Sequence, residues 1–76
     1  MTPPTPDWLA STIDRYQRPL SAYARRLLGN EDAARDAVQE TFLRLYSKSP
    51  GELNGSLVSW LYTVCRSRAM DIRRSE

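Results

Sequence analysis

Apolar side chains recur at spacings of three and four residues along three separate segments of this chain, and this period constrains the fold more than any other feature. Such spacing places them on one face of an α-helix, whereas a strand would need apolar and polar residues in alternation. The three segments run from about Asp7, from about Glu31 to Tyr46, and from Ser56 to about Arg73. The sequence therefore predicts an all-α protein, a small bundle of three to four helices.

Short local signals mark the ends of these helices. Asp7 is a candidate N-cap, and Gly29 followed by Asn30 predicts a helix stop and a cap for the next helix. Pro19 lies inside the first segment, where we expect it to kink or split the helix. The expected inner faces consist of Ile13, Tyr16, Leu20, Tyr23 and Leu27, with Trp8 upstream, and of Ala34, Val38, Phe42 and Leu45.

The length of 76 residues suits one small domain. The opening MTPPTP carries three prolines, so we expect residues 1–6 to be a disordered lead-in. The helical domain then covers residues 7–74, and residues 75–76 start a linker or tail. No apolar run approaches the roughly 18 residues of a membrane span, and no signal-peptide pattern is present. These features predict a soluble, cytoplasmic protein.

The inventory of reactive side chains argues against catalysis. The chain has no histidine and a single cysteine, Cys65, so it has neither an internal disulfide nor a zinc site of the usual Cys/His kind. Histidine is also the commonest general base. Since nothing groups the carboxylates into a pair, we expect a protein that is not an enzyme and that binds no metal or cofactor.

The third segment carries two different faces. Its expected inner face consists of Leu57, Trp60, Leu61, Val64, Cys65 and Ile72, and its other face of Thr63, Arg66, Ser67, Met70, Arg73 and Arg74. A guanidinium is a permanent cation with a planar fork of donors suited to phosphate oxygens, so the second face can follow a nucleic-acid backbone. An ordinary solvated surface is the alternative, because the helix dipole favours arginines near a C-terminus.

The second segment has an outward surface of its own. Asp36, Gln39, Glu40 and Leu43 recur at helical spacing and lie mostly off the expected core face. An exposed leucine among polar residues is typical of a protein-docking patch, but single surface leucines are also common. The pattern leaves both interpretations open.

The strings GNEDAARDAVQETFLRLY and SWLYTVCRSRAMDIRR, separated by a polar loop, resemble region two of bacterial sigma factors of the extracytoplasmic-function class. RYQRPLSAYARRLLGN is similar to the first helical stretch of that family. The resemblance covers about Tyr16 to Arg74, and its parts agree in order and spacing. It implies a compact helical domain that recruits core RNA polymerase and opens promoter DNA at the minus-ten element.

The resemblance also implies roles for particular residues. Docking on the beta-prime clamp helices of the polymerase maps to Asp36, Gln39, Glu40, Leu43 and Arg44. Capture of an unpaired base of the non-template strand maps to Lys48 to Ser59, with Asn54 and Gly55 as contributors, and contact with the promoter backbone maps to Thr63, Arg66, Ser67, Arg73 and Arg74. An anti-sigma factor is a further partner that the family implies.

Two kinds of departure stand out. The family usually has asparagine where this chain has Ser67, and often a basic residue where it has Thr63, so contacts expected on the DNA side are missing. Family members also usually carry a second helical domain that reads the minus-thirty-five element. Because the chain stops at RRSE, about where the linker would begin, we expect an excised domain.

Two other functions compete with this one. A helix-turn-helix module would read duplex DNA without polymerase, but it needs a short turn before its recognition helix, and the ten-residue loop SKSPGELNGS argues against it. A helical protein-interaction module without a nucleic-acid role, such as a remnant that binds an anti-sigma factor, is the other alternative.

Overall fold

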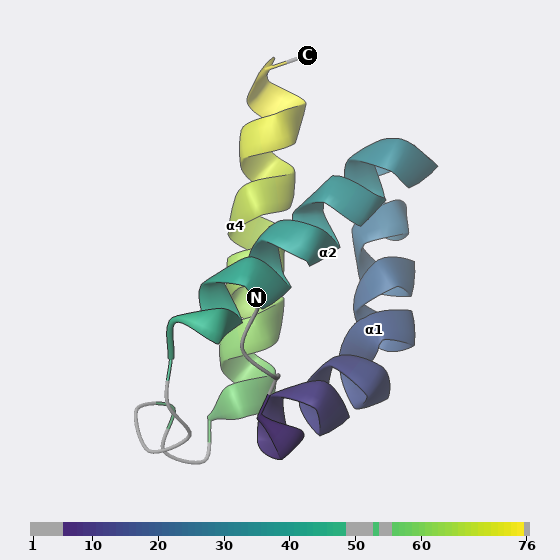
Figure 1. Cartoon of the computed structure of the whole chain (residues 1–76). Helices are drawn as coiled ribbons and strands as arrows, with labels where there is room; N and C mark the ends of the chain where they lie inside the picture. The colour runs from purple at the N-terminus through teal and green to yellow at the C-terminus, as the bar shows by residue number, and fades with distance from the viewer. Residues whose placement is uncertain (1–5, 49–52, 54–55, 76) are drawn as a thin grey trace, which may run out of the picture.

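The computed structural model describes residues 6–48, 53 and 56–75. Within these ranges the chain forms helices α1 (Asp7–Leu28), α2 (Glu31–Tyr46) and α4 (Leu57–Ser75), and no strand. The helices α1 and α4 start at the same end of the molecule, and α2 runs diagonally across α4 (Figure 1). This arrangement confirms the predicted all-α fold. Residues 1–5 of the expected lead-in, 49–52 and 54–55 of the loop, and Glu76 lie outside the described residues.

Helix α1 corrects the prediction for its N-cap. Asp7 is the first helical residue and not the N-cap, because Pro6 precedes the helix and no side chain caps it. The Pro6 carbonyl instead accepts hydrogen bonds from the amides of Leu9 and Ala10, both at 3.0 Å. Of the two outcomes expected at Pro19, a kink or a split, the split does not occur, because α1 is continuous through Pro19 and its ribbon bends along its length (Figure 1). The helix continues through Pro19 because the turns on either side of it are buried against the same core.

The buried line of α1 also differs from the predicted stripe. Leu20 is buried as expected, but its buried partners are Leu9, Thr12 and Ala24. The predicted Ile13, Tyr16 and Tyr23, together with Trp8, are only partly buried and pack around the core, and Leu27 is half-buried. The side chains buried along α1 are therefore smaller than those that the periodicity alone indicated.

The turn between α1 and α2 follows the local signals. Gly29 adopts φ +65° and its amide donates a hydrogen bond to the Arg25 carbonyl at 2.8 Å, which closes α1. The Asn30 side chain accepts a hydrogen bond from the Ala33 amide at 2.9 Å, which caps α2. Both predictions are confirmed, and they explain how two residues reverse the chain so that α2 packs back on α1.

We expect Gly29→Ala to lower the free energy of unfolding by about 1–2 kcal/mol, because a residue with a Cβ is strained in the left-handed region. Nothing lies within 4 Å of a Cβ built at Gly29, so a steric clash adds nothing to this cost. Urea denaturation followed by circular dichroism measures it. Gly29→Asn is the control, since asparagine tolerates this conformation better. Equal stability of the Ala variant and the parent would contradict the prediction.

The core lies where the three helices meet. Helix α4 contributes Leu61, Cys65 and Ala69, which recur every four residues and are all fully buried. The predicted Leu57, Trp60 and Ile72 are partly buried and pack against the core, whereas Val64 is half-buried and lies outside it. Helix α2 contributes Ala34, Ala37, Val38, Thr41, Phe42 and Leu45. One face of α4 is thus held against the bundle, which leaves the opposite face free.

Candidate nucleic-acid interface

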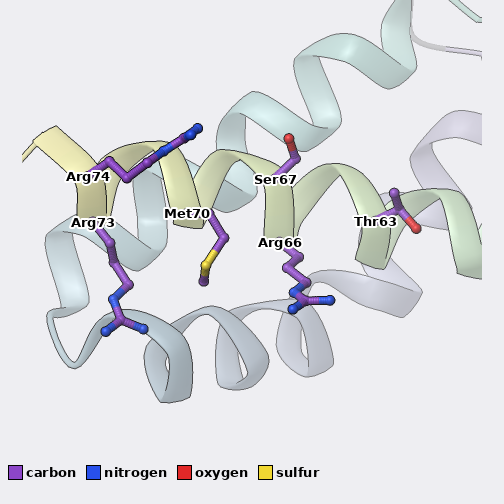
Figure 2. A pocket seen from close by; sticks show the side chains of 6 residues that line it. All are labelled: Thr63, Arg66, Ser67, Met70, Arg73 and Arg74. Carbon is purple, nitrogen blue, oxygen red and sulfur yellow. The ribbon is translucent and has the colours of Figure 1, made fainter.

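The free face of α4 forms one open depression. Its lining consists of Thr63, Arg66, Ser67, Met70, Arg73 and Arg74, and its volume is about 710 Å³. These are the six residues that the helical spacing grouped on one face. Figure 2 shows Arg66, Met70 and Arg73 projecting to one side of α4, and Ser67 and Arg74 to the other. The face is shaped by the burial of Leu61, Cys65 and Ala69 on the opposite side of the helix.

The arginines of this face differ in their availability. Arg66 and Arg73 are exposed, and neither makes an ion pair with a residue in the described ranges. Arg74 pairs with Asp71 one turn before it, and both side chains are well exposed. An exposed pair of this kind contributes little free energy and exchanges readily with another anion. The depression therefore presents two unpaired cations and one weakly paired cation to an anionic ligand.

The fourth arginine of α4 does not belong to this face. Arg68 donates from Nη2 to the Asp36 carboxylate of α2 at 2.9 Å, and its Nε is buried without a hydrogen-bond partner among the described residues. Sequence reasoning missed this contact, although Arg68 follows Leu61 by seven residues and so lies near the inner face. Asp36, which the resemblance assigned to polymerase docking, is thus also a contact between α2 and α4.

The other residues assigned to polymerase docking lie on the outer side of α2. Leu43 is 64% exposed, the largest value among the large hydrophobic residues that the structure describes. Glu40 forms an ion pair with Arg44 at 3.8 Å, and Gln39 is exposed. Tyr46, three residues after Leu43, is also exposed and was missed, although the same spacing would have identified it. These side chains form a mixed polar and apolar surface typical of protein docking.

The residues assigned to base capture are only partly described. Lys48 is exposed just after the end of α2, and Ser59 is exposed in the first turn of α4, one turn before Thr63. Neither lines the depression. Asn54 and Gly55 lie outside the described residues. Ser59 therefore extends the free face of α4 toward the loop.

Cys65, the single cysteine of the chain, is buried in the core. Burial raises the pKa of the Cys65 thiol, an effect that a hydrogen bond with Thr41 opposes in part. The thiol is fully buried and protonated at neutral pH, which makes it a poor nucleophile. Within residues 6–48, 53 and 56–75, no three metal-ligating side chains come together. In the same ranges, no helix has the length and apolar character needed to cross a membrane.

Comparison with known proteins identifies relatives of this chain. The chain is 39% identical over 69 residues to the ECF RNA polymerase sigma factor SigL of Mycobacterium tuberculosis, which covers 88% of this chain and 39% of SigL. It is 30% identical over 66 residues to the ECF RNA polymerase sigma factor SigW of Bacillus subtilis, which covers 86% of this chain and 35% of SigW. No solved structure matches it. The family model for Sigma-70 region 2 matches residues 12–76, and the chain therefore belongs to the Sigma-70 region 2 family.

Proposed function

We propose that this chain is the part of a sigma factor that binds core RNA polymerase through α2 and opened promoter DNA through the free face of α4. The observation that carries the proposal is the cationic depression of α4, which lies opposite the buried side of the same helix. Because the buried side is anchored in the core, the arginines are held in a constant register. The family match supports the same assignment.

The proposed action is non-enzymatic. Unstacking a base costs a few kcal/mol, and this domain must offset that cost by binding. Arginine–phosphate contacts supply affinity through counterion release. A domain that binds the opened strand more tightly than the duplex shifts the equilibrium toward the opened state, by as much as the two affinities differ. We assign this preference to the α4 face together with the neighbouring loop.

Two hydroxyl side chains weaken the proposed contacts with the DNA backbone. Thr63 and Ser67 line the depression at positions where the family resemblance implies a basic residue and an asparagine. A hydroxyl donates one hydrogen bond and carries no charge, so it contributes less to phosphate affinity than a cation. We infer that this domain binds DNA mainly through Arg66 and Arg73 and relies on polymerase for the remaining affinity. An anti-sigma factor and a cytoplasmic location are further parts of the proposal.

A comparison of single-stranded and duplex DNA tests the proposed function. The chain is titrated into labelled mixed-sequence oligonucleotides of either form, at low salt and over a salt series. We expect tighter binding to the single strand and an affinity that falls as salt rises. Tighter binding to duplex would favour the helix-turn-helix alternative. Binding to neither form would reject a nucleic-acid role and favour the protein-interaction alternative.

For the α2 surface, we expect Leu43→Ala to weaken binding to the beta-prime clamp helices on the order of tenfold, because an exposed apolar anchor loses its contact area. Binding is measured by interferometry with a purified clamp-helix fragment. Val58→Ala is the matched control, since Val58 is also an exposed hydrophobic residue but lies on α4. An equal loss in both variants, or none in the Leu43 variant, removes this surface from the proposal.

A further inference from the structure

An aromatic contact between α1 and α4 lies one turn before Arg66. The Tyr23 ring of α1 meets the Tyr62 ring of α4 edge to face, with centroids 5.1 Å apart and planes at 74°. The two helices run in the same direction (Figure 1), and Arg66 and Arg73 project toward the side on which α1 lies in Figure 2. The aromatic pair thus holds α1 against α4 one turn before Arg66, which lines the cationic depression.

A cation of α1 falls on the same edge. Arg26 follows Tyr23 by three residues, and Arg66 follows Tyr62 by four, so each arginine lies one turn beyond the aromatic contact and on the same side of its helix. Arg26 is exposed and, within the described residues, makes no ion pair. We call the group Tyr23, Arg26, Tyr62, Arg66 and Arg73 the α1–α4 seam.

Asp14 of α1 and Asp71 of α4 lie away from the seam. Asp14 precedes Tyr23 by nine residues, which is about two and a half turns, and therefore lies on the opposite side of α1. Asp71 follows Tyr62 by the same number of residues and lies on the opposite side of α4, where it pairs with Arg74. Asp14 and Asp71 are thus separated from the seam arginines, so a chain with a net charge of only +2 presents a cationic seam.

We propose that the nucleic-acid surface continues across the seam onto α1, where Arg26 binds a phosphate of the same DNA strand that occupies the α4 face. The inference rests on the proposed function and extends it to a second helix. Arginines gathered without a carboxylate repel one another, and a polyanion that passes along the seam relieves this repulsion. The guanidinium fork of Arg26 matches phosphate oxygens in the same way as those of Arg66 and Arg73.

A pair of charge-matched variants tests the role of Arg26. Arg26→Gln and Arg18→Gln each remove one exposed arginine from α1, but Arg18 lies away from Tyr23 and lines an outward depression with Asp14 and Arg25. Affinity for a labelled single-stranded oligonucleotide is measured over a salt series. We expect the slope of log K against log salt to decrease in magnitude by about 0.7 for Arg26→Gln, the value for one phosphate contact. We expect no change in the slope for Arg18→Gln.

Further variants separate this inference from the proposed function. Arg26→Lys keeps the charge and should restore the slope, and thermal unfolding of each variant verifies that the fold is intact. If Arg66→Gln lowers the slope and Arg26→Gln does not, the α4 face stands and the seam is wrong. If neither changes it, the proposed DNA face fails as well. The seam proposal is overturned if Arg26→Gln and Arg18→Gln change the slope equally. It is also overturned if Arg26→Gln changes binding to the clamp-helix fragment and leaves DNA binding unchanged.

Discussion

Leu61→Ala is expected to lower the free energy of unfolding by about 3 kcal/mol, within the range for truncation of a buried leucine. Leu61 is fully buried in the second turn of α4, and α1 and α2 both pack against this helix. The truncation removes three carbon atoms and leaves a cavity that rigid neighbouring helices fill only in part. In a domain of this size the total stability is small, so the loss is a large fraction of it.

Chemical denaturation monitored by circular dichroism at 222 nm measures this effect, with thermal unfolding as a second measurement. Val58→Ala on the same helix is the control, because Val58 is exposed and its truncation should change stability by less than about 0.5 kcal/mol. The DNA face depends on the same anchoring, so Leu61→Ala should also weaken DNA binding at temperatures where it is partly unfolded. Comparable stability losses for the two variants would show that α4 is not held by its buried side.

The second large effect is expected for the double variant Arg66→Gln, Arg73→Gln. Each charge-assisted contact with phosphate contributes on the order of tenfold in affinity, so we expect roughly a hundredfold loss for single-stranded DNA at low salt. The slope of log K against log salt should fall in magnitude by about 1.4. Stability should change little, because neither arginine makes an ion pair with a described residue.

The matched control is the double variant Arg18→Gln, Arg35→Gln, which lowers the net charge by the same amount at exposed positions of α1 and α2. If affinity depended on net charge alone, both double variants would lose it equally, and the assignment of the α4 face would be wrong. If the control keeps its affinity for single-stranded DNA, the position of the arginines determines binding, and not the net charge. Both proteins should unfold at temperatures close to that of the parent.

Arg68 shows why a count of the arginines on α4 overstates the number of cations on its DNA face. Four arginines lie on α4, and by sequence type they are equivalent. Arg68 is nevertheless turned toward α2, where it binds Asp36 at 2.9 Å. Because both side chains are partly exposed, this ion pair adds little stability. It does orient the Asp36 carboxylate, which lies in the surface proposed for polymerase docking.

Local signals alone were enough to predict the bounds of α2, the cap at Asn30, the stop at Gly29 and the six residues of the α4 face. Helix period and capping depend only on atoms within about four residues along the chain, so they can be read without knowing the neighbours. The same local rules were misleading at Asp7, which is the first helical residue of α1 and not its N-cap. At that end the Pro6 carbonyl accepts the first hydrogen bonds of the helix, and no side chain caps it.

The sequence by itself determined which side chains share a face of each helix, because the α-helical period leaves no choice once a helix forms. Only the tertiary structure decided which faces meet. The pairing of Arg68 with Asp36, 32 residues apart, and the contact of Tyr23 with Tyr62 depend on how three helices cross. Crossing angles follow from the shapes of many buried side chains together, and no single spacing along the chain encodes them.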